Sequence, residues 1–266
     1  MAEAKIYWAD GDSPKMIEAF QNAQKTFKYF WRELSWEYRR IIPALSLACV
    51  KIAFSQEIEN ESPIVEHMWI NEVNFDGHNV SGILINIPNE LTNIKKGDLV
   101  NVPLNQISDW LFAIPGNSSK PVLSRSGSSQ RPKTYGGFTI QAMRSDMSEQ
   151  ERNEHDNAWG MDFGDFNEVL VVYEQKEKPE NLIEHPMSIN MKEKLIEFLK
   201  ENRDEISNKD DKGLNMLHKE TIAGNLSSVE VLLSFGADKS IKSNQGETAL
   251  DFAMKLDWEH IIKVLK

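Results

Sequence analysis

Two short segments of the sequence carry residues that could do chemistry. Asp109 stands beside Trp110, and the segment Tyr135–Thr139 brings a second pair of aromatic residues, Tyr135 and Phe138. A carboxyl group placed among aromatic side chains can have a raised pKa and serve as a general acid or base. One hypothesis is therefore an enzyme or a small-ligand receptor with a cleft lined by these residues, although such pairs are more often core and turn residues.

A basic stretch of an otherwise acidic chain surrounds the second segment. Residues 110–145 contain no Asp or Glu, and their basic residues are Lys120, Arg125, Arg131, Lys133 and Arg144. Exposed backbone N–H groups at Gly136 and Gly137, next to Arg131 and Lys133, would suit a carboxylate or a phosphate. We therefore expect a small anion as a ligand here. A solvated loop explains the same composition, and the two glycines then only permit a bulge or a tight bend.

Other catalytic and metal-binding signatures are missing from the sequence. It has no G-x-S-x-G elbow, phosphate-binding Gly-Lys loop, H-E-x-x-H motif or dinucleotide fingerprint. Glu66-His67 and the pair Glu151 and His155 lack a visible third metal ligand. Cys49 is the single cysteine, which excludes an internal disulfide and predicts a buried, inert thiol in an apolar strand. We expect no catalytic residue, no metal and no cofactor.

Periodicity predicts a helix followed by a strand at the start of the chain. Ser13-Pro14 is typical of a helix start, and apolar residues at three- and four-residue steps extend the helix to about Arg39. After Pro43 the period changes to two, and residues 46–54 read as a strand. This helix is expected to pack on a sheet.

Further strands follow in the same part of the chain. Residues 66–88 read as a hairpin about the two-residue turn Asp76-Gly77. Residues 95–116 supply two more strands, residues 168–174 another, and Ser148 with Glu151 forms a capping box that opens a helix. The turn predicts a hairpin register that pairs Phe75 with His78, Val73 with Val80, Ile70 with Ile83, and Trp69 with Leu84.

The order of several motifs resembles a known family. These motifs are EHMWI (66–70), GILINIP (82–88), GDLVNV (97–102), ISDW (107–110) and YGGFT (135–139). In this order they resemble the bacterial YegJ-like family, a domain of unknown function numbered 2314, over roughly residues 15–150. The resemblance implies a fold and no activity. The Ser-rich segment 117–132 lengthens the connection between the last two motifs.

The last third of the chain is repetitive. Gly213 and Gly246 open two similar segments 33 residues apart (246 − 213 = 33), and this spacing resembles ankyrin repeats. Residues 191–210 resemble half of another repeat. Glu220 replaces the small residue of the family pattern, so we expect it to face something outside the stack. About two and a half repeats are too few for independent stability, and we expect the module to dock on the preceding domain.

These observations predict an α+β fold with a long N-terminal helix packed on a twisted, mainly antiparallel sheet, followed by a short all-α ankyrin-repeat module. The expected domains are residues 1–174 and 190–266, joined by a linker at 175–189. The longest apolar run is too short to span a membrane, and no secretory signal is visible, so a cytoplasmic location is expected. The net charge of −11 disfavours nucleic acid and attracts basic proteins.

Two functions from different classes remain open. The first is a non-catalytic interaction or regulatory protein of bacterial type. One specific version of it is an immunity protein that neutralises a basic partner. Its protein-binding residues are expected at Glu220, Lys242, Asn244 and Gln245. The second is the enzyme or small-ligand receptor with its site near Asp109, Trp110 and the Tyr135–Thr139 segment.

Overall fold

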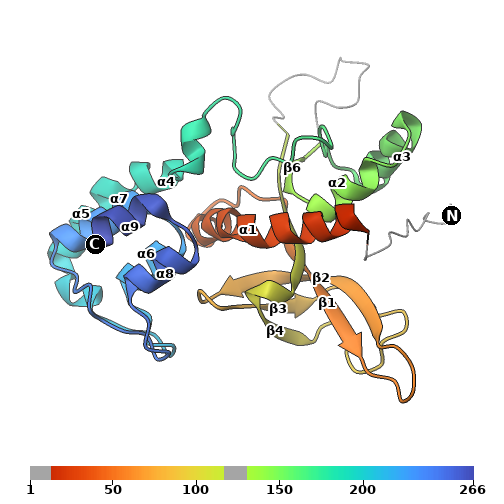
Figure 1. Ribbon diagram of the computed structural model, residues 1–266. Coiled ribbons are helices and arrows are strands. Elements are labelled where there is room, and N and C mark those ends of the chain that lie inside the picture. Colours follow the sequence, from red (N-terminus) through yellow and green to blue (C-terminus); the bar gives the residue numbers. More distant parts are fainter. Residues whose placement is uncertain (1–12, 117–130) are drawn as a thin grey trace. The chain divides into compact units, whose positions relative to one another are not determined.

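The computed structural model describes residues 13–116 and 131–266, which form two compact units (Figure 1). Of the described residues, the first unit contains 13–30, 40–75, 79–116 and 131–171. The second contains 31–39, 76–78 and 172–266. The predicted Ser-rich insert at 117–132 lies almost entirely outside the described residues, as do Lys120 and Arg125.

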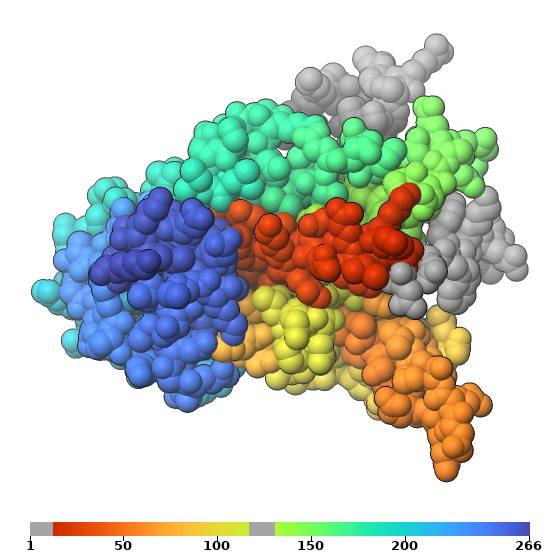
Figure 2. Space-filling view, in the orientation of Figure 1, coloured from red at the N-terminus to blue at the C-terminus, as the bar shows by residue number. Residues whose placement is uncertain are grey.

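The first unit contains a six-stranded antiparallel sheet, which confirms the predicted α+β fold class. Its strands are ordered β4-β3-β2-β1-β5-β6. Strong alternation between buried and exposed positions, as in the β3 pattern, marks strands with one covered face. The strands are β1 (Leu47–Gln56), β2 (Ile64–Phe75), β3 (Asn79–Leu84), β4 (Leu99–Pro103), β5 (Ile107–Ile114) and β6 (Lys133–Gly136). The connection between β1 and β2 projects from the body of this unit (Figure 2).

The predicted N-terminal helix is present as α1 (Pro14–Glu37). Its start agrees with the Ser13 prediction, because the Ser13 hydroxyl accepts a hydrogen bond from the N–H of Met16 at 3.3 Å. Phe27, fully buried, packs edge-on against Phe75 of β2 at 5.1 Å between ring centroids. The helix therefore covers one face of the sheet with its apolar stripe.

The predicted hairpin exists, but its predicted register is wrong. Phe75 pairs with Val80 instead of His78, and Ile70 pairs with Leu84. The loop is wider than two residues because the Asp76 carboxylate accepts a hydrogen bond from the N–H of His78 at 2.9 Å, a local turn that competes with the ladder. A bulge between Asn71 and Asn74, where Glu72 has a positive φ of 50°, shifts the register again.

Two helices follow the last strand of the sheet. They are α2 (Phe138–Arg144) and α3 (Glu149–Trp159), and α3 begins with the predicted capping box of Ser148 and Glu151. Ile140 of α2 joins Cys49, Leu111 and Phe163 in a second apolar cluster. The strand predicted at 168–174 is absent: this segment lies without regular structure, although the carbonyl of Leu170 accepts a hydrogen bond from Gly136.

Paired helices dominate the second unit. The segment expected as a linker contains a 3₁₀ turn (Pro179–Leu182) and runs into α4 (Pro186–Asn190). The next helices are α5 (Lys192–Glu201), α6 (Met216–Ile222), α7 (Leu226–Ser234), α8 (Ala249–Lys255) and α9 (Glu259–Leu265). The pair α8–α9 repeats the pair α6–α7 at the predicted spacing (249 − 216 = 33 and 259 − 226 = 33).

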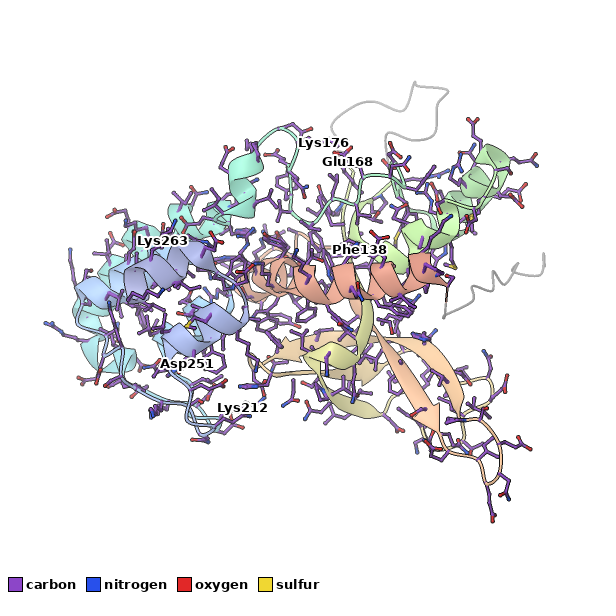
Figure 3. The ribbon with its side chains drawn as sticks, in the orientation of Figure 1. Phe138, Glu168, Lys176, Lys212, Asp251 and Lys263 are labelled. Atoms are coloured by element: carbon purple, nitrogen blue, oxygen red, sulfur yellow. The ribbon has the colours of Figure 1, made fainter. Side chains whose placement is uncertain are left out.

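Equivalent residues cap the two pairs. The Asn215 side chain accepts a hydrogen bond from the N–H of His218, and the Thr248 side chain accepts one from Asp251, so each first helix begins with a capping box. Asp251 is labelled in Figure 3. His218 also reaches the carbonyl of Ile241 through its Nε2 at 3.1 Å, so this histidine ties the first helix of the pair to the segment that follows the second.

Candidate functional site

The Asp109 carboxylate caps the first turn of α2. It accepts hydrogen bonds from the N–H groups of Phe138 and Thr139 at 3.0 and 2.8 Å, and from the Thr139 hydroxyl at 2.6 Å. The cap residue of α2 is Gly137, which has no side chain to satisfy these donors. Asp109 is fully buried on β5. The carboxylate therefore performs from a neighbouring strand the task that a local cap would perform.

Gly136 and Gly137 carry the chain from β6 directly into α2. Both have positive φ angles, of 74° and 73°. A Cβ atom on Gly136 would lie 2.3 Å from the carbonyl oxygen of Trp110, so the two backbones approach too closely for any side chain. The predicted tight bend is confirmed, but it ends a strand and starts a helix instead of forming a bulge within the sheet.

The aromatic residues of the two segments fill the core. Tyr135 stacks on Phe112 with ring centroids 4.7 Å apart. Phe138, labelled in Figure 3, packs edge-on against Trp110 at 5.8 Å. The Trp110 indole N–H donates to the carbonyl of Ala23 in α1 at 3.0 Å. These side chains are packing partners, and none of them is more than 9% exposed.

Lys51 is the charged neighbour of Asp109. The two residues pair across the β1–β5 ladder, and the Lys51 ammonium donates to the Thr139 hydroxyl at 2.9 Å. Burial lowers the pKa of Lys51, an effect that the Asp109 charge opposes. Burial likewise raises the pKa of Asp109, against the Lys51 charge and the hydrogen bonds to Thr139 and Trp110. Thr139 thus links the half-buried Lys51 ammonium to the buried Asp109 carboxylate.

Cys49 lies two residues before Lys51 on the same strand. It is buried, as predicted. Burial raises the pKa of its thiol, and the Asp109 charge adds to this effect. A thiol held in its neutral form is a poor nucleophile.

Two residues of the motif EHMWI contact other parts of the first unit. Glu66 accepts hydrogen bonds from the N–H groups of Asn89, Glu90 and Leu91. His67 lies with its Nδ1 2.6 Å from the hydroxyl of Ser108. A serine beside an imidazole is the arrangement of a nucleophile and its base, but Ser108 is 3% exposed and offers no open face to a substrate.

The structure places Arg131 and Lys133 apart from the residues around Asp109. Arg131 bonds to the side chain of Asn157 in α3, and the Lys133 ammonium lies 5.8 Å from the ring centroid of Tyr135. Gly136 uses its N–H on the carbonyl of Leu170, and Gly137 uses its own on Trp110. Both glycine N–H groups are therefore occupied within the chain, and the anion at Arg131 and Lys133 stays a prediction.

Glu220 faces other residues of the second unit. It is buried, and it pairs with Arg39 at 2.7 Å and with the side-chain amide of Asn225 at 2.8 Å. Asn225 in turn accepts a hydrogen bond from the indole of Trp36 at 2.9 Å. The acid that departs from the repeat pattern is thus explained by an arginine near the end of α1.

The remaining predicted residues, Lys242, Asn244 and Gln245, lie on the loop 242–247. This loop contacts a preceding loop, 209–214, and we call the two the finger loops. Asn244 joins them, because its N–H donates to the carbonyl of Lys212 at 3.0 Å and its side-chain amide donates to the carbonyl of Asp211 at 2.8 Å. The carbonyl of Lys242 accepts a hydrogen bond from the Lys209 ammonium at 3.0 Å. Lys242, Asn244 and Gln245 are exposed. The two loops therefore form one continuous polar surface.

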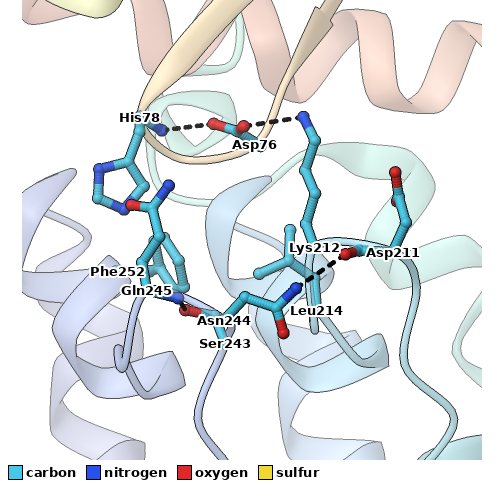
Figure 4. A pocket seen from close by; sticks show the side chains of 9 residues that line it. All are labelled: Asp76, His78, Asp211, Lys212, Leu214, Ser243, Asn244, Gln245 and Phe252. Atoms are coloured by element: carbon cyan, nitrogen blue, oxygen red, sulfur yellow. Dashed lines mark hydrogen bonds and ion pairs between the residues drawn. The ribbon is translucent and has the colours of Figure 1, made fainter.

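A cavity of about 210 Å³ lies beside the finger loops (Figure 4). Its walls combine both loops with the hairpin turn and a phenylalanine of α8. The lining residues are Asp76, His78, Asp211, Lys212, Leu214, Ser243, Asn244, Gln245 and Phe252. The sequence prediction named Asn244 and Gln245 as protein-binding residues, but it named neither Lys212 nor the hairpin residues Asp76 and His78 as such.

Comparison of the sequence with known proteins identifies the family of this chain. The sequence model of a family described as "Uncharacterized protein conserved in bacteria (DUF2314)" matches residues 13–163. The chain belongs to this DUF2314 family. A protein of Neisseria meningitidis serogroup B, named provisionally as an ankyrin repeat protein, is 45% identical over 266 residues, covering all of this chain and 98% of that protein.

A second relative covers only part of the chain. The uncharacterized protein YegJ of Escherichia coli K12 is 25% identical over 89 residues, which are 34% of this chain and 48% of YegJ. No solved structure gives a significant match. Among the described residues, no helix is long and apolar enough to cross a membrane, and no group of three or more His, Cys, Asp and Glu side chains is arranged to hold a metal ion.

The DUF2314 motifs meet one another in space. Asp109 of ISDW caps the helix that YGGFT begins, and His67 of EHMWI contacts Ser108 of ISDW. The sequence prediction treated Asp109 and YGGFT as sides of a cleft, whereas the structure joins them by direct hydrogen bonds. The missed residue in this DUF2314 network is Lys51. A lone lysine in an otherwise apolar strand was the available signal, because a charge in such a position requires a partner.

Proposed function

We propose that this protein is a non-catalytic interaction protein and that its C-terminal helix pairs form a short ankyrin-repeat module. The 33-residue spacing of α6–α7 and α8–α9 supports this assignment, as does the name of the Neisseria relative. Repeat modules of this kind use extended surfaces to bind other proteins. A partner protein is therefore the proposed ligand.

The finger loops carry the proposal. Asn244 holds the two loops in a fixed relation through the backbone of Lys212 and Asp211, so the exposed side chains between them are pre-organised. Lys242 and Gln245 are exposed at the second loop. A rigid polar rim beside a cavity with an aromatic wall is suited to a protein contact.

The chemistry around Asp109 supports a non-catalytic role for the DUF2314 unit. Its carboxylate is engaged by Trp110, Phe138 and Thr139 and is fully buried. A group that holds a helix in place from the interior is a structural group. This reading favours an interaction protein over an enzyme.

We further propose a regulatory or immunity-like role in a bacterium. The net charge of −11 would attract and steer a basic partner. The family description supports a bacterial setting. This part of the proposal rests on charge and on fold-level analogy.

The test compares two charge-matched variants of the full chain. Lys242→Glu with Gln245→Glu alters the finger loops, and Lys194→Gln with Lys200→Glu makes the same change in net charge on the exposed side of α5. A partner is captured from extracts of the native host with the wild-type chain and purified. Its affinity for each chain is then measured directly by calorimetry.

We expect the finger-loop variant to bind at least about tenfold more weakly, as removal of a central contact does, and the α5 variant to bind as the wild type does. Equal binding by all three chains would contradict the assignment of the binding surface. A partner that is turned over chemically by the wild-type chain would contradict the non-catalytic role.

A further inference from the structure

The hairpin turn Asp76-Gly77-His78 belongs to the second unit, where Asp76 and His78 contact the finger loops and Gly77 lies against Phe252 of α8. Asp76 forms an ion pair with Lys212 of the first finger loop at 2.8 Å (Figure 4). His78 bonds to Glu247 of the second finger loop. It also contacts Lys255 of α8. The surface therefore already holds a turn of the same chain.

The position of Gly77 leaves no room for a side chain. A Cβ atom there would lie 2.5 Å from the Phe252 ring and 3.3 Å from Ile222. Gly77 also has a φ of 94°, which favours glycine. The Phe252 ring lies edge-on to His78 with centroids 5.6 Å apart. Phe252 thus forms a floor against which only a glycine backbone fits.

Together these contacts make three adjacent subsites. Lys212 receives an acid, Phe252 receives a glycine, and Glu247 receives an imidazole or a cation. The internal geometry of the turn accounts for Asp76 and Gly77, since Asp76 accepts the N–H of His78. It does not account for the facing residues: the Lys212 ammonium pairs with the Asp76 carboxylate, and the Glu247 carboxylate lies against the His78 imidazole.

The turn leaves part of the surface open. Asp211, Asn244 and Gln245 line the cavity beside it, and the Asn244 side-chain amide donates to the carbonyl of Asp211. The cavity continues the subsites toward the exposed finger loops. A larger partner could therefore use the same subsites and the open part together.

Resting on the proposed function, we infer that the finger-loop surface recognises a protein turn of acid–glycine–imidazole type, and that residues 76–78 occupy this surface as an internal competitor. The partner is a protein that presents such a turn and displaces the internal one. A tethered segment competes at an effective concentration in the millimolar range. A partner can bind only while the internal turn is away from the subsites. The apparent affinity of the partner is therefore its intrinsic affinity multiplied by the fraction of time for which the subsites are free.

The probe is a cyclised peptide with the sequence of residues 73–80, Val-Asn-Phe-Asp-Gly-His-Asn-Val. Its binding is measured by NMR titration of the labelled full chain. The peptide is added to three chains: the wild type, the variant Asp76→Ser/His78→Ser, and the variant His78→Ser alone, which keeps the Asp-Gly turn. Thermal melts establish that each of the three chains is folded. A peptide with asparagine in place of the acid serves as the control.

We expect the peptide to bind the double variant at least about tenfold more tightly than the wild type, with His78→Ser between them. The control peptide should not bind to any of these chains. The further substitution Lys212→Glu in the double variant should abolish binding of the probe peptide. Equal binding to wild type and variant, or equal binding of the control peptide, would overturn the inference. A concentration-dependent dimer of the wild type that dissociates with peptide would also overturn it, because the turn would then occupy a second copy. If the purified partner needs Lys242 and Gln245 while the peptide fails to bind, the proposed function stands and the turn recognition falls.

Discussion

The Thr139 hydroxyl lies 2.6 Å from the Asp109 carboxylate, and the Thr139 main-chain N–H lies 2.8 Å from the same carboxylate oxygen. The two residues belong to separate motifs of the DUF2314 family. Their contact explains why an acid and a Gly-Gly turn that are distant in sequence belong together: one element supplies the donors and the other supplies the acceptor.

Removing the Asp109 carboxylate should strongly destabilise the first unit. Asp109→Ala leaves the N–H groups of Phe138 and Thr139 unsatisfied and the Lys51 charge uncompensated, which costs about 3–5 kcal/mol. Thr139→Val, which loses only the hydroxyl, should cost about 1–2 kcal/mol. Urea unfolding of both variants measures the difference. A cost below about 1 kcal/mol for Asp109→Ala would show that the cap is dispensable.

Substitution of Gly136 should be far more costly than substitution of another glycine with a similar backbone. Gly136→Ala puts a methyl group against the carbonyl of Trp110 and forces a positive φ, so it should lose more than about 3 kcal/mol or fail to fold. Gly160→Ala has a φ of 65° with open space around it, and should lose only about 1–2 kcal/mol. Thermal melts of both variants report the contrast. Equal losses would rule out the close approach as the reason for the glycine.

Cys49 should react with thiol reagents only in the unfolded chain. It is buried, and burial raises the pKa of its thiol. Labelling with a maleimide at pH 7 should be at least about a hundredfold slower in the native protein than in denaturant, since reaction requires local or global opening. Mass spectrometry of quenched samples gives both rates. Rapid native labelling would mean that β1 opens readily.

The second unit should lose stability as the pH falls below neutrality. Burial lowers the pKa of His218, against the hydrogen bond to the carbonyl of Ile241. Its Nδ1 accepts a hydrogen bond from the N–H of Asn215, which requires that nitrogen to carry no proton. The unfolded chain therefore binds a proton first, so stability is full above the ordinary histidine pKa of about 6.5 and declines as the pH falls through it toward the folded value.

The comparison variant is His218→Gln, which does not titrate. Between pH 7 and pH 5 the wild type should lose more stability than this variant does, by up to about 1 kcal/mol. Urea unfolding at the two pH values measures both losses. Identical losses would mean that His218 does not set the pH dependence.

Sequence periodicity predicted the elements better than their pairing. The helix from Ser13, the strand at 46–54 and the 33-residue spacing follow from local patterns. The structure contains the helix, the strand and two helix pairs at this spacing. The hairpin register failed because a side-chain hydrogen bond of Asp76 widened the turn. Such competition between side chain and ladder is not visible in the alternation of apolar residues.

The candidate site shows the same limit. Gly136 and Gly137 were correctly read as a bend, but the partner that needs this bend, Asp109, lies on another strand, and only the fold brings the two together. Glu220 was expected among the protein-binding residues, but it is buried and pairs within the chain. Its partner Arg39 lies just beyond the C-terminal end of α1, and no local pattern connects residues so far apart in the chain.

The pairing of β5 with β6 has a consequence for how this family can vary. Ala113 pairs with Thr134, and Ile114 pairs with Lys133, so the two ends of the intervening connection are fixed by the sheet and by the Asp109 cap. Closing a longer connection between fixed ends costs only about 0.6 kcal/mol for each doubling of its length. The position after Ile114 is therefore an insertion port, where relatives can gain new sequence without any change to the strands on either side.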